Sequence, residues 1–312
     1  MNKYFSIARI DHWPKNIMMI PGALLGILVD ELLLSEQTLF FLMAFFGTCL
    51  VASANYTINE FLDKDFDRHH PRKKTRALVD QDISAKAIAL QYGILAGAGL
   101  LLLYPLHLTA FCGGLSLLFM GMVYNVRPMR TKEVVYLDVL SESINNPIRL
   151  IIGWGAVTSI ILPPVSLMLC FWFGGAFLMA TKRYSEFRYI GSPALASKYR
   201  KSFEHYTELS LLLSSFFYAL LSIFMLAIFL IKYRSEFLFC FPFIAIIFTW
   251  YLYLSHKPDH SIAMEPEKIY QNRPYFAFLL LTCSVALVLF LIDIPIANFI
   301  ADHRVKLDYR WE

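Results

Sequence analysis

Nine long apolar stretches recur along this chain, and they constrain its fold more than any other feature. Each approaches the roughly 20 residues that a helix needs to cross the hydrocarbon core of a bilayer. They are continuous runs, unlike the alternating segments of a membrane barrel, so helices are the expected spanning elements. We therefore predict an all-α polytopic membrane protein of nine helices. The predicted spans cover residues 16–33, 38–62, 84–104, 106–125, 134–158, 164–187, 208–231, 236–255 and 275–299.

No Pro-, Gly- or Ser-rich linker divides these stretches, so residues 1–312 are interpreted as one transmembrane domain. Charged residues make up 17% of the chain, against about 25% in an ordinary soluble domain. This scarcity argues against a disordered chain, a secreted disulfide-rich module and a nucleic-acid-binding domain. The five cysteines lie inside predicted spans without paired spacing and are interpreted as packing residues.

Basic residues are distributed unevenly between the two ends of the predicted helices. Most of the 28 Lys and Arg residues lie before the first span or after the second, fourth, sixth and eighth spans. Because cytoplasmic loops retain Lys and Arg, this asymmetry predicts a cytoplasmic N-terminus and a C-terminus on the other side. The basic face is also where an anionic substrate would be attracted.

An acidic cluster closes the second predicted span. Asn59, Asp63 and Asp67 are spaced at i, i+4 and i+8, so a continuing helix places them on one face, about 6 Å apart along its axis, with Glu60 beside them. Carboxylates at this spacing repel one another unless a cation lies between them. Hard oxygen ligands suit Mg²⁺, particularly Mg²⁺ that carries a diphosphate. These four residues are therefore candidate metal ligands; the alternative is a solvated acidic helix end, offset by neighbouring basic side chains.

A basic loop follows the acidic cluster and contains Arg72, Lys73, Lys74 and Arg76. A cytoplasmic loop can be basic for reasons of topology alone, which is the alternative interpretation. Metal ligands followed by cations nevertheless suit two halves of one phosphate site. The cations would neutralise the phosphate oxygens that the metal does not reach.

The acidic cluster and its loop resemble the UbiA superfamily of intramembrane prenyltransferases. The family pattern Asn-Asp-x-x-Asp-x-x-x-Asp is matched with Glu60 in the second position, which keeps a carboxylate. Within the superfamily, the chain is similar to the branch that contains decaprenyl-phosphate phosphoribosyltransferase, although Ala77 replaces a proline of that branch. The resemblance implies nine helices around a central cavity that opens to lipid. The matching continuation of the motif is Asp67, Arg68, His70, Pro71, Lys73 and Arg76.

Four further segments carry the same resemblance, and beyond residue 210 only the hydropathy is similar. His12 and Asn125 depart from the pattern of the branch, which has Gln and Ser there. The resemblance implies that the matching residues, together with Lys73 and Arg76, bind the substrates. The matches are Lys15 and Asn16 before the first span, Tyr124, Lys132 and Asp138 after the fourth, Arg149 in the fifth, and Lys182, Arg183 and Glu186 at the end of the sixth.

Lys182 and Arg183 distinguish two branches of the superfamily. Members that ionise a prenyl diphosphate usually carry a second Asp-rich motif at this position, so bases here indicate a second anionic substrate instead of a second metal. An ordinary positive-inside helix end is the alternative. In the following loop, Tyr199 and Arg200 are interpreted as solvated residues in preference to parts of a lid.

Arg149 lies inside the fifth predicted span, where a charge is costly unless it faces a polar cavity or a partner. The first half of this span is unusually polar, and we expect its polar face to line the substrate chamber. A structural ion pair between Arg149 and Glu142 or Asp138 is the alternative.

The residues and the resemblance together favour a Mg²⁺-dependent phosphoribosyltransferase of a bacterial inner membrane, with its site facing the cytoplasm. Asn59, Asp63 and Asp67 would bind Mg²⁺ and the diphosphate of phosphoribosyl diphosphate, and a polyprenyl phosphate would accept the sugar. One alternative is a prenyltransferase that joins a prenyl diphosphate to an aromatic or haem-like acceptor. Another is a membrane transporter or lipid-binding protein. No nucleic-acid partner is expected, and assembly into a homo-oligomer is left open.

Overall fold

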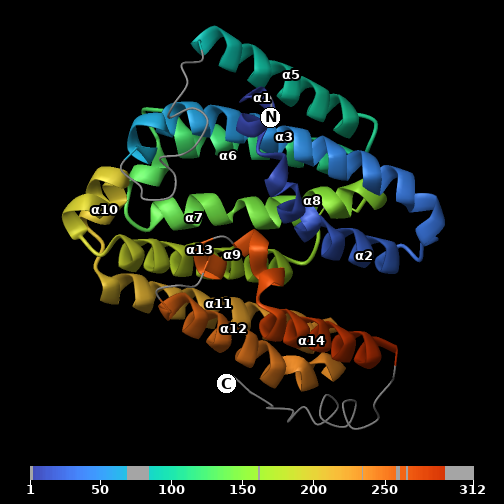
Figure 1. Ribbon diagram of the computed structural model, residues 1–312. Coiled ribbons are helices and arrows are strands. Elements are labelled where there is room, and N and C mark those ends of the chain that lie inside the picture. The colour runs from blue at the N-terminus through green and yellow to red at the C-terminus, as the bar shows by residue number, and fades with distance from the viewer. Residues whose placement is uncertain are drawn as a thin grey trace, which may run out of the picture.

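The computed structural model describes residues 3–68, 84–160, 162–233, 235–257, 261–264 and 266–291. Every regular element in these ranges is a helix, as the sequence predicts (Figure 1). Lys73 and Arg76, which the resemblance assigns to the phosphate site, lie outside the described residues.

The N-terminal part of the chain contains α1 (Lys3–Ala8), η1 (Ile10–Met19), α2 (Ile20–Val29), α3 (Leu34–Asp67), α5 (Ala85–Leu103), α6 (Leu108–Asn125), η3 (Thr131–Glu133), α7 (Leu137–Ser143) and α8 (Asn145–Val157). The C-terminal part contains α9 (Val165–Ile190), α10 (Pro193–Tyr199), η4 (Lys201–Glu204), α11 (Glu208–Tyr233), η5 (Ser235–Cys240), α12 (Phe241–His256), α13 (Ser261–Met264), η6 (Pro266–Gln271) and α14 (Arg273–Leu291).

Two of the predicted spans are broken in the structure. Residues 16–33 divide between η1 and the short helix α2, and residues 134–158 divide between α7 and α8. The second break precedes Pro147, whose missing N–H cannot donate to the preceding turn. Within the described residues, six helical segments are long and apolar enough to cross a membrane, so nine spans remain a prediction. The six are α3, α5, α6, α9, α11 and the segment Glu236–His256 that contains α12.

Helix α8 lies in the middle of the bundle and contacts α2, α3, α6 and α9. Helix α5 packs against α3, and α11 packs against α9. In Figure 1 the long helices run nearly side by side, from α5 at the top to α12 and α14 at the bottom. The polar residues that begin α8 are therefore surrounded by other helices instead of facing lipid.

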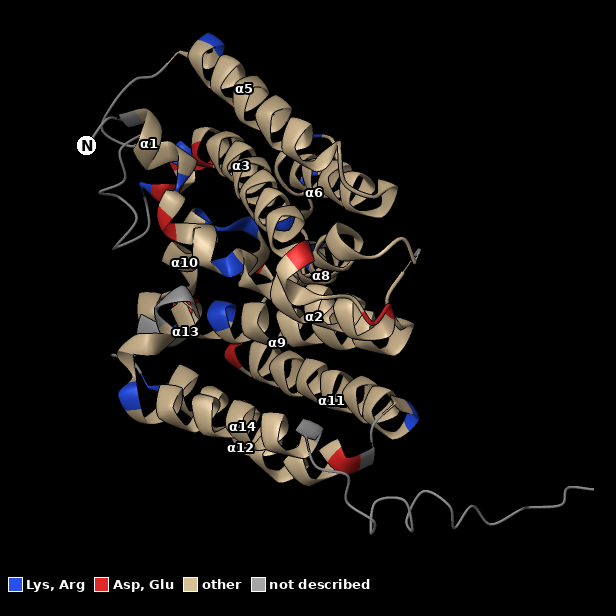
Figure 2. Ribbon diagram, turned by 90° about the vertical axis from the view of Figure 1, so that its right-hand side faces the viewer, with Lys and Arg blue, Asp and Glu red and all other residues tan. Residues whose placement is uncertain are grey.

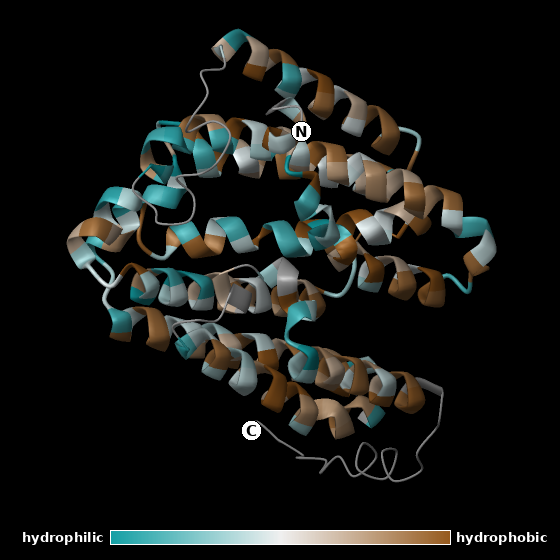
Figure 3. Cartoon of the chain, in the orientation of Figure 1, coloured by the Kyte–Doolittle hydropathy of each residue, from teal (hydrophilic) through white to brown (hydrophobic). Residues whose placement is uncertain are grey.

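Charged residues gather at one end of the helices. Figure 2 shows Lys, Arg, Asp and Glu concentrated around α1 and α10, with few along the rest of the long helices. Figure 3 shows the same distribution as hydropathy, with hydrophilic residues near α10 and mainly hydrophobic residues along the helices. This asymmetry agrees with the uneven distribution of basic residues in the sequence. Which side of a membrane this end faces remains a prediction.

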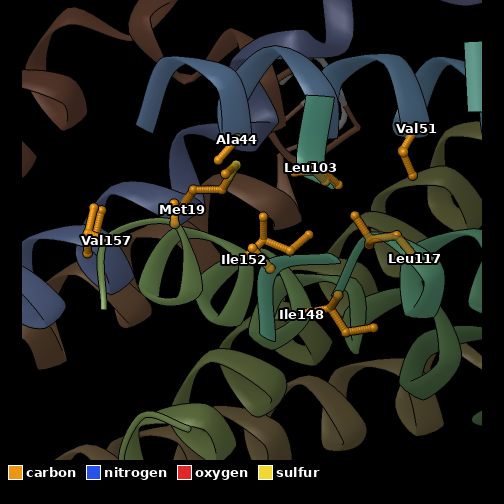
Figure 4. Packing of buried hydrophobic residues seen from close by; sticks show 11 residues of the cluster. Met19, Ala44, Val51, Leu103, Leu117, Ile148, Ile152 and Val157 are labelled. Carbon is orange, nitrogen blue, oxygen red and sulfur yellow. The ribbon is translucent and has the colours of Figure 1, made fainter. Parts of the chain in front are cut away.

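The main apolar core lies where α2, α3, α6 and α8 meet, and includes Ile148, Ile152 and Val157 of α8 (Figure 4). Two glycines let α2 and α8 approach closely. A Cβ on Gly22 would lie 2.0 Å from the carbonyl oxygen of Leu150, and one on Gly153 would lie 2.0 Å from that of Met19. This backbone contact fixes the position of α8, and with it the side chains that α8 directs toward the polar end of the bundle.

Candidate active site

A cavity with about 1240 Å³ of empty space, part of it open to solvent, lies between α3, α6, α8, α9, η1 and the segments around η3 and η4. The structure brings residues from distant motifs together in its wall. Of the sequence-predicted site residues, those that line the cavity are Lys15, Asn59, Asp63, Asp67, Tyr124, Lys132, Arg149, Lys182 and Arg183. Four other predicted residues do not line it: Asn16, Glu60, Asp138 and Glu186.

The wall of this cavity is strongly basic. Its Lys and Arg residues are Arg9, Lys15, Arg130, Lys132, Arg149, Lys182, Arg183, Arg200 and Lys201. Its Asp and Glu residues are Asp63, Asp67, Glu133 and Glu142. Such an excess of positive charge in a partly enclosed space attracts anions and discriminates against cations. Sequence analysis did not select Arg9, Arg130 or Lys201, which stand in short segments without a recognisable motif.

Asp63 is held by three residues. Nζ of Lys132 lies 2.6 Å and Nη2 of Arg130 lies 3.1 Å from its Oδ1, and Asn59 donates to its Oδ2 at 3.3 Å. Asn125 accepts from both Asn59 and Lys132, at 2.5 and 2.8 Å. The carboxylate is therefore fixed in orientation before any ligand binds, because each of its oxygens has a donor.

Lys132 is the most deeply buried basic partner in this network. Burial lowers the pKa of its ammonium group to about 8, against the opposing effect of the Asp63 carboxylate. Lys132 therefore stays mainly protonated at neutral pH, and its charge offsets that of Asp63.

Glu60 does not line the cavity, although it lies close to Asp67 round the helix. It is 6% exposed and pairs with Arg9 at 3.4 Å, which joins the N-terminal segment to α3. Of the four predicted metal ligands, Asn59, Asp63 and Asp67 line the cavity and Glu60 does not.

Arg149 is held by amides instead of carboxylates. Its Nε donates to Asn16 at 2.8 Å, and its Nη1 donates to Asn146 at 3.4 Å. No ion pair with Glu142 or Asp138 is present, so the structural alternative for Arg149 is wrong. Among the described residues its hydrogen-bond partners are neutral, and Arg149 lines the cavity.

Asp138 and Glu186 act on Arg183 from behind the cavity wall. Asp138 is fully buried and accepts from Nε of Arg183 at 3.2 Å, while Glu186 accepts from Nη1 at 2.9 Å. Burial and the Asp138 carboxylate raise the pKa of Tyr206, whose hydroxyl donates to Asp138 at 2.8 Å. The structure thus gives the two predicted carboxylates a role in orienting a cation, with no surface of their own on the cavity.

The segment after α9 folds back onto the cavity. Tyr199 is 4% exposed, and Arg200 lines the cavity with only 13% of its side chain exposed. The interpretation of these two residues as solvated is therefore wrong. The burial of these residues is difficult to predict from a single sequence, because the segment lacks the periodicity that marks a buried face.

Comparison with known proteins now places the chain in a family. The model of the UbiA prenyltransferase family matches residues 19–266. The chain belongs to this family. This membership favours an enzyme over the transporter alternative. With six long apolar helices, this UbiA family member is an integral membrane protein.

The curated proteins that are similar to this chain are named for several different reactions. Protoheme IX farnesyltransferase of Geobacillus thermodenitrificans is 33% identical over 156 residues, which are 48% of this chain and 50% of that protein. Decaprenyl-phosphate phosphoribosyltransferase of Mycobacterium tuberculosis is 31% identical over 214 residues, 63% of each chain. The chain thus spans about half the length of the first relative and less than two thirds of the second.

Solved structures support the same fold. A UbiA homolog from Archaeoglobus fulgidus, determined with DMAPP and Mg²⁺, has a TM-score of 0.69 at 18% identity, over 94% of this chain and 100% of that one. This likeness establishes the architecture of the bundle.

The residues of this UbiA cavity fit a metal ion that arrives with its substrate. Within the described residues, no group of three or more His, Cys, Asp or Glu side chains is placed to hold a metal by itself. Mg²⁺ is usually bound by one or two carboxylates plus the phosphates of a substrate. Asp63 and Asp67, one helical turn apart on the cavity wall, provide such a pair, and Asn59 adds an amide oxygen.

Proposed function

We propose that this UbiA family protein transfers the 5-phosphoribosyl group of phosphoribosyl diphosphate to a polyprenyl phosphate and releases diphosphate. The observation that carries the proposal is that Lys182 and Arg183 line the same cavity as Asp63 and Asp67. Bases in the same cavity as a single acidic group favour two anionic substrates over one diphosphate held between two groups of metal-binding acids.

The acidic side of the cavity would receive phosphoribosyl diphosphate. Asp63 and Asp67 would hold Mg²⁺, which neutralises charge on the diphosphate as it leaves. Asn59 and Lys132 keep the Asp63 carboxylate oriented. Lys73 and Arg76 remain proposed sources of further positive charge, although they lie outside the described residues.

The basic side of the cavity would receive the lipid phosphate. Lys15, Lys182 and Arg149 would supply its positive charge, whereas the charge of Arg183 is offset by Asp138 and Glu186. The C1–O bond between ribose and diphosphate breaks, and an oxygen of the lipid phosphate forms the new bond to C1. A phosphate is already ionised at neutral pH, so this oxygen needs no general base. Stabilising the charge on the leaving group then supplies most of the acceleration.

The chemistry of the substrates also suggests how the protein is oriented. Phosphoribosyl diphosphate is highly charged and must reach the cavity from water. We therefore propose that the charged end of the helices, with the N-terminus, faces the cytoplasm of a bacterial cell. The isoprenoid tail of the acceptor would extend into lipid, where apolar chains gain most from burial.

A second candidate function is transfer of a prenyl group from its diphosphate to haem or an aromatic acid. The similarity to protoheme IX farnesyltransferase supports it. In that reaction the basic residues of α9 would have no second phosphate to bind, so we rank it below phosphoribosyl transfer.

One assay separates the two functions. Protein in nanodiscs with Mg²⁺ is incubated with labelled phosphoribosyl diphosphate and a polyprenyl phosphate, and in parallel with farnesyl diphosphate plus haem or 4-hydroxybenzoate. The proposal predicts label in the lipid fraction of the first reaction. A prenylated haem or aromatic acid, with no labelled lipid, would support the second candidate and refute the first.

A further inference from the structure

The guanidinium group of Arg183 already donates hydrogen bonds to oxygens of the protein. Its Nε, Nη1 and Nη2 donate to Asp138, Glu186 and the hydroxyl of Tyr124, at 3.2, 2.9 and 3.3 Å. Only 2% of its side chain is exposed. Every nitrogen of this guanidinium therefore has a partner, and Arg183 has little capacity left for direct contact with a ligand.

Arg200 reaches the same place from a different segment and keeps a donor available. Its Nη1 donates to the Tyr124 hydroxyl and to the carbonyl oxygen of Lys132, both at 3.4 Å. Its Nε is buried without a hydrogen-bond partner, and within the described part of the chain its Nη2 makes no hydrogen bond either. Arg183 and Arg200 thus converge on one hydroxyl oxygen, and Arg200 lines the cavity with donors that no protein group uses.

Asp138 anchors the segment that carries Arg200. Its Oδ2 accepts from Ser202 at 3.2 Å and lies 3.8 Å from Nη1 of Arg200, and its Oδ1 accepts from Tyr206 at 2.8 Å. The side chains of Ser202 and Tyr206 thus attach the segment after Arg200 to the same buried carboxylate that orients Arg183. A guanidinium held in this way loses little freedom when it binds a ligand.

We propose that Arg200 contacts a phosphate group of a substrate directly, and that Asp138 and Arg183 position it. This inference rests on the proposed function. A guanidinium presents a planar set of donors that matches phosphate oxygens, and a basic cavity wall is where such a group would lie. Two substrates carry phosphate, the polyprenyl phosphate and phosphoribosyl diphosphate, and the test distinguishes them.

The test compares Arg200→Gln and Arg200→Lys with Lys198→Gln. Lys198 is exposed on α10, two residues away, and does not line the cavity, so its variant is a matched loss of charge. KM is measured separately for each substrate in nanodiscs. We expect Arg200→Gln to raise KM for one substrate by about 10-fold or more, because a hydrogen bond to a charged group is lost. Arg200→Lys should give a smaller rise, and Lys198→Gln should leave both KM values within about twofold.

The substrate whose KM rises is the one that Arg200 contacts. KM values for both substrates within twofold of wild type in Arg200→Gln would overturn the proposal. If Arg200→Gln elutes as misfolded protein, Arg200→Lys becomes the deciding variant. Wild-type KM values for both substrates in Arg200→Lys would then overturn the proposal, because a positive charge without the planar guanidinium would suffice.

A binding measurement keeps this inference separate from the reaction. Binding of inorganic diphosphate and of farnesyl phosphate to wild type and Arg200→Gln is followed by thermal shift. If wild type makes no phosphoribosyl lipid, the proposed function fails, whereas weaker binding of either ligand to Arg200→Gln still supports a phosphate contact. Equal binding of both ligands to the two proteins would refute the contact whatever the reaction.

Discussion

Nζ of Lys132 lies 2.6 Å from Oδ1 of Asp63, where η3 meets the end of α3. Arg130 reaches the same oxygen at 3.1 Å, so one carboxylate oxygen is held by two cations from a short connecting segment. In the proposed function, a diphosphate that brought Mg²⁺ to Asp63 would also bring phosphate oxygens to these cations. The ion pairs would then be exchanged for contacts with substrate without leaving a buried charge unpaired.

Replacing Lys132 should impair use of phosphoribosyl diphosphate. We expect Lys132→Met to lower kcat/KM for this substrate by about 10- to 100-fold, because a hydrogen bond to a charged group contributes about 1.5–3 kcal/mol. Lys86→Met is the control, since Lys86 is exposed at the start of α5 and does not line the cavity. Initial rates at varied phosphoribosyl diphosphate check this, and a wild-type value for Lys132→Met would contradict it.

The acids of α3 provide a test with a control on the same helix. Asp63→Asn and Asp67→Asn should each lower transfer by at least about 100-fold, because a metal ion contributes several kcal/mol of charge stabilisation and both variants remove a charged ligand. Asp65→Asn should stay within about twofold, since the Asp65 side chain is 71% exposed and outside the cavity. Unchanged size-exclusion profiles establish folding. Similar losses of transfer activity in all three variants would mean that activity depends on the total negative charge at the end of α3 and not on Asp63 and Asp67 in particular.

The sequence identifies α3 and its acids well because a long apolar helix ending in acids has a clear period. The 3.6-residue repeat groups Glu60 with Asp63 and Asp67, at i+3 and i+7, as well as grouping Asn59, Asp63 and Asp67. It could not reveal that Glu60 pairs with Arg9, because that contact comes from a distant segment. The apolar runs likewise predicted most helix bounds closely. They missed the break before α8, where Pro147 interrupts a run that hydropathy treats as continuous.

The rest of the cavity wall could not be predicted in the same way. Arg130 and Arg200 reach the cavity from short connecting segments whose positions depend on tertiary contacts. Arg200 meets Tyr124 across 76 residues of sequence, and no local pattern encodes such a contact. Asp138 was selected through the resemblance, yet its burial behind Arg183 became clear only in three dimensions.

Asp138 should matter for stability as well as for the orientation of two arginines. We expect Asp138→Asn to lower the free energy of unfolding by about 3–5 kcal/mol, because it removes the buried carboxylate charge that Arg183 and Arg200 share. Glu208→Gln removes an exposed ion pair with Arg188 and should cost less than about 1 kcal/mol. Denaturant unfolding in detergent micelles compares the two. Equal, small losses would show that Arg183 is satisfied without Asp138.

The close contact between α2 and α8 predicts a contrast between two glycines. Gly153→Ala should lower the free energy of unfolding by at least about 2 kcal/mol, because the added Cβ would lie 2.0 Å from the carbonyl oxygen of Met19. Gly93→Ala adds a methyl group to α5 where no atom lies within 4 Å. That change should be neutral or stabilise by up to about 1 kcal/mol. The same unfolding measurement decides, and a stable Gly153→Ala protein would show that α2 and α8 can separate freely.

The most direct test of the account is mass spectrometry of the lipid recovered after wild-type protein, Mg²⁺, phosphoribosyl diphosphate and a polyprenyl phosphate are incubated together. The account predicts that the lipid phosphate gains one phosphoribosyl group, that diphosphate is released in equal amount, and that Asp63→Asn gives neither product. Unmodified lipid phosphate from a preparation that prenylates haem or an aromatic acid would contradict it.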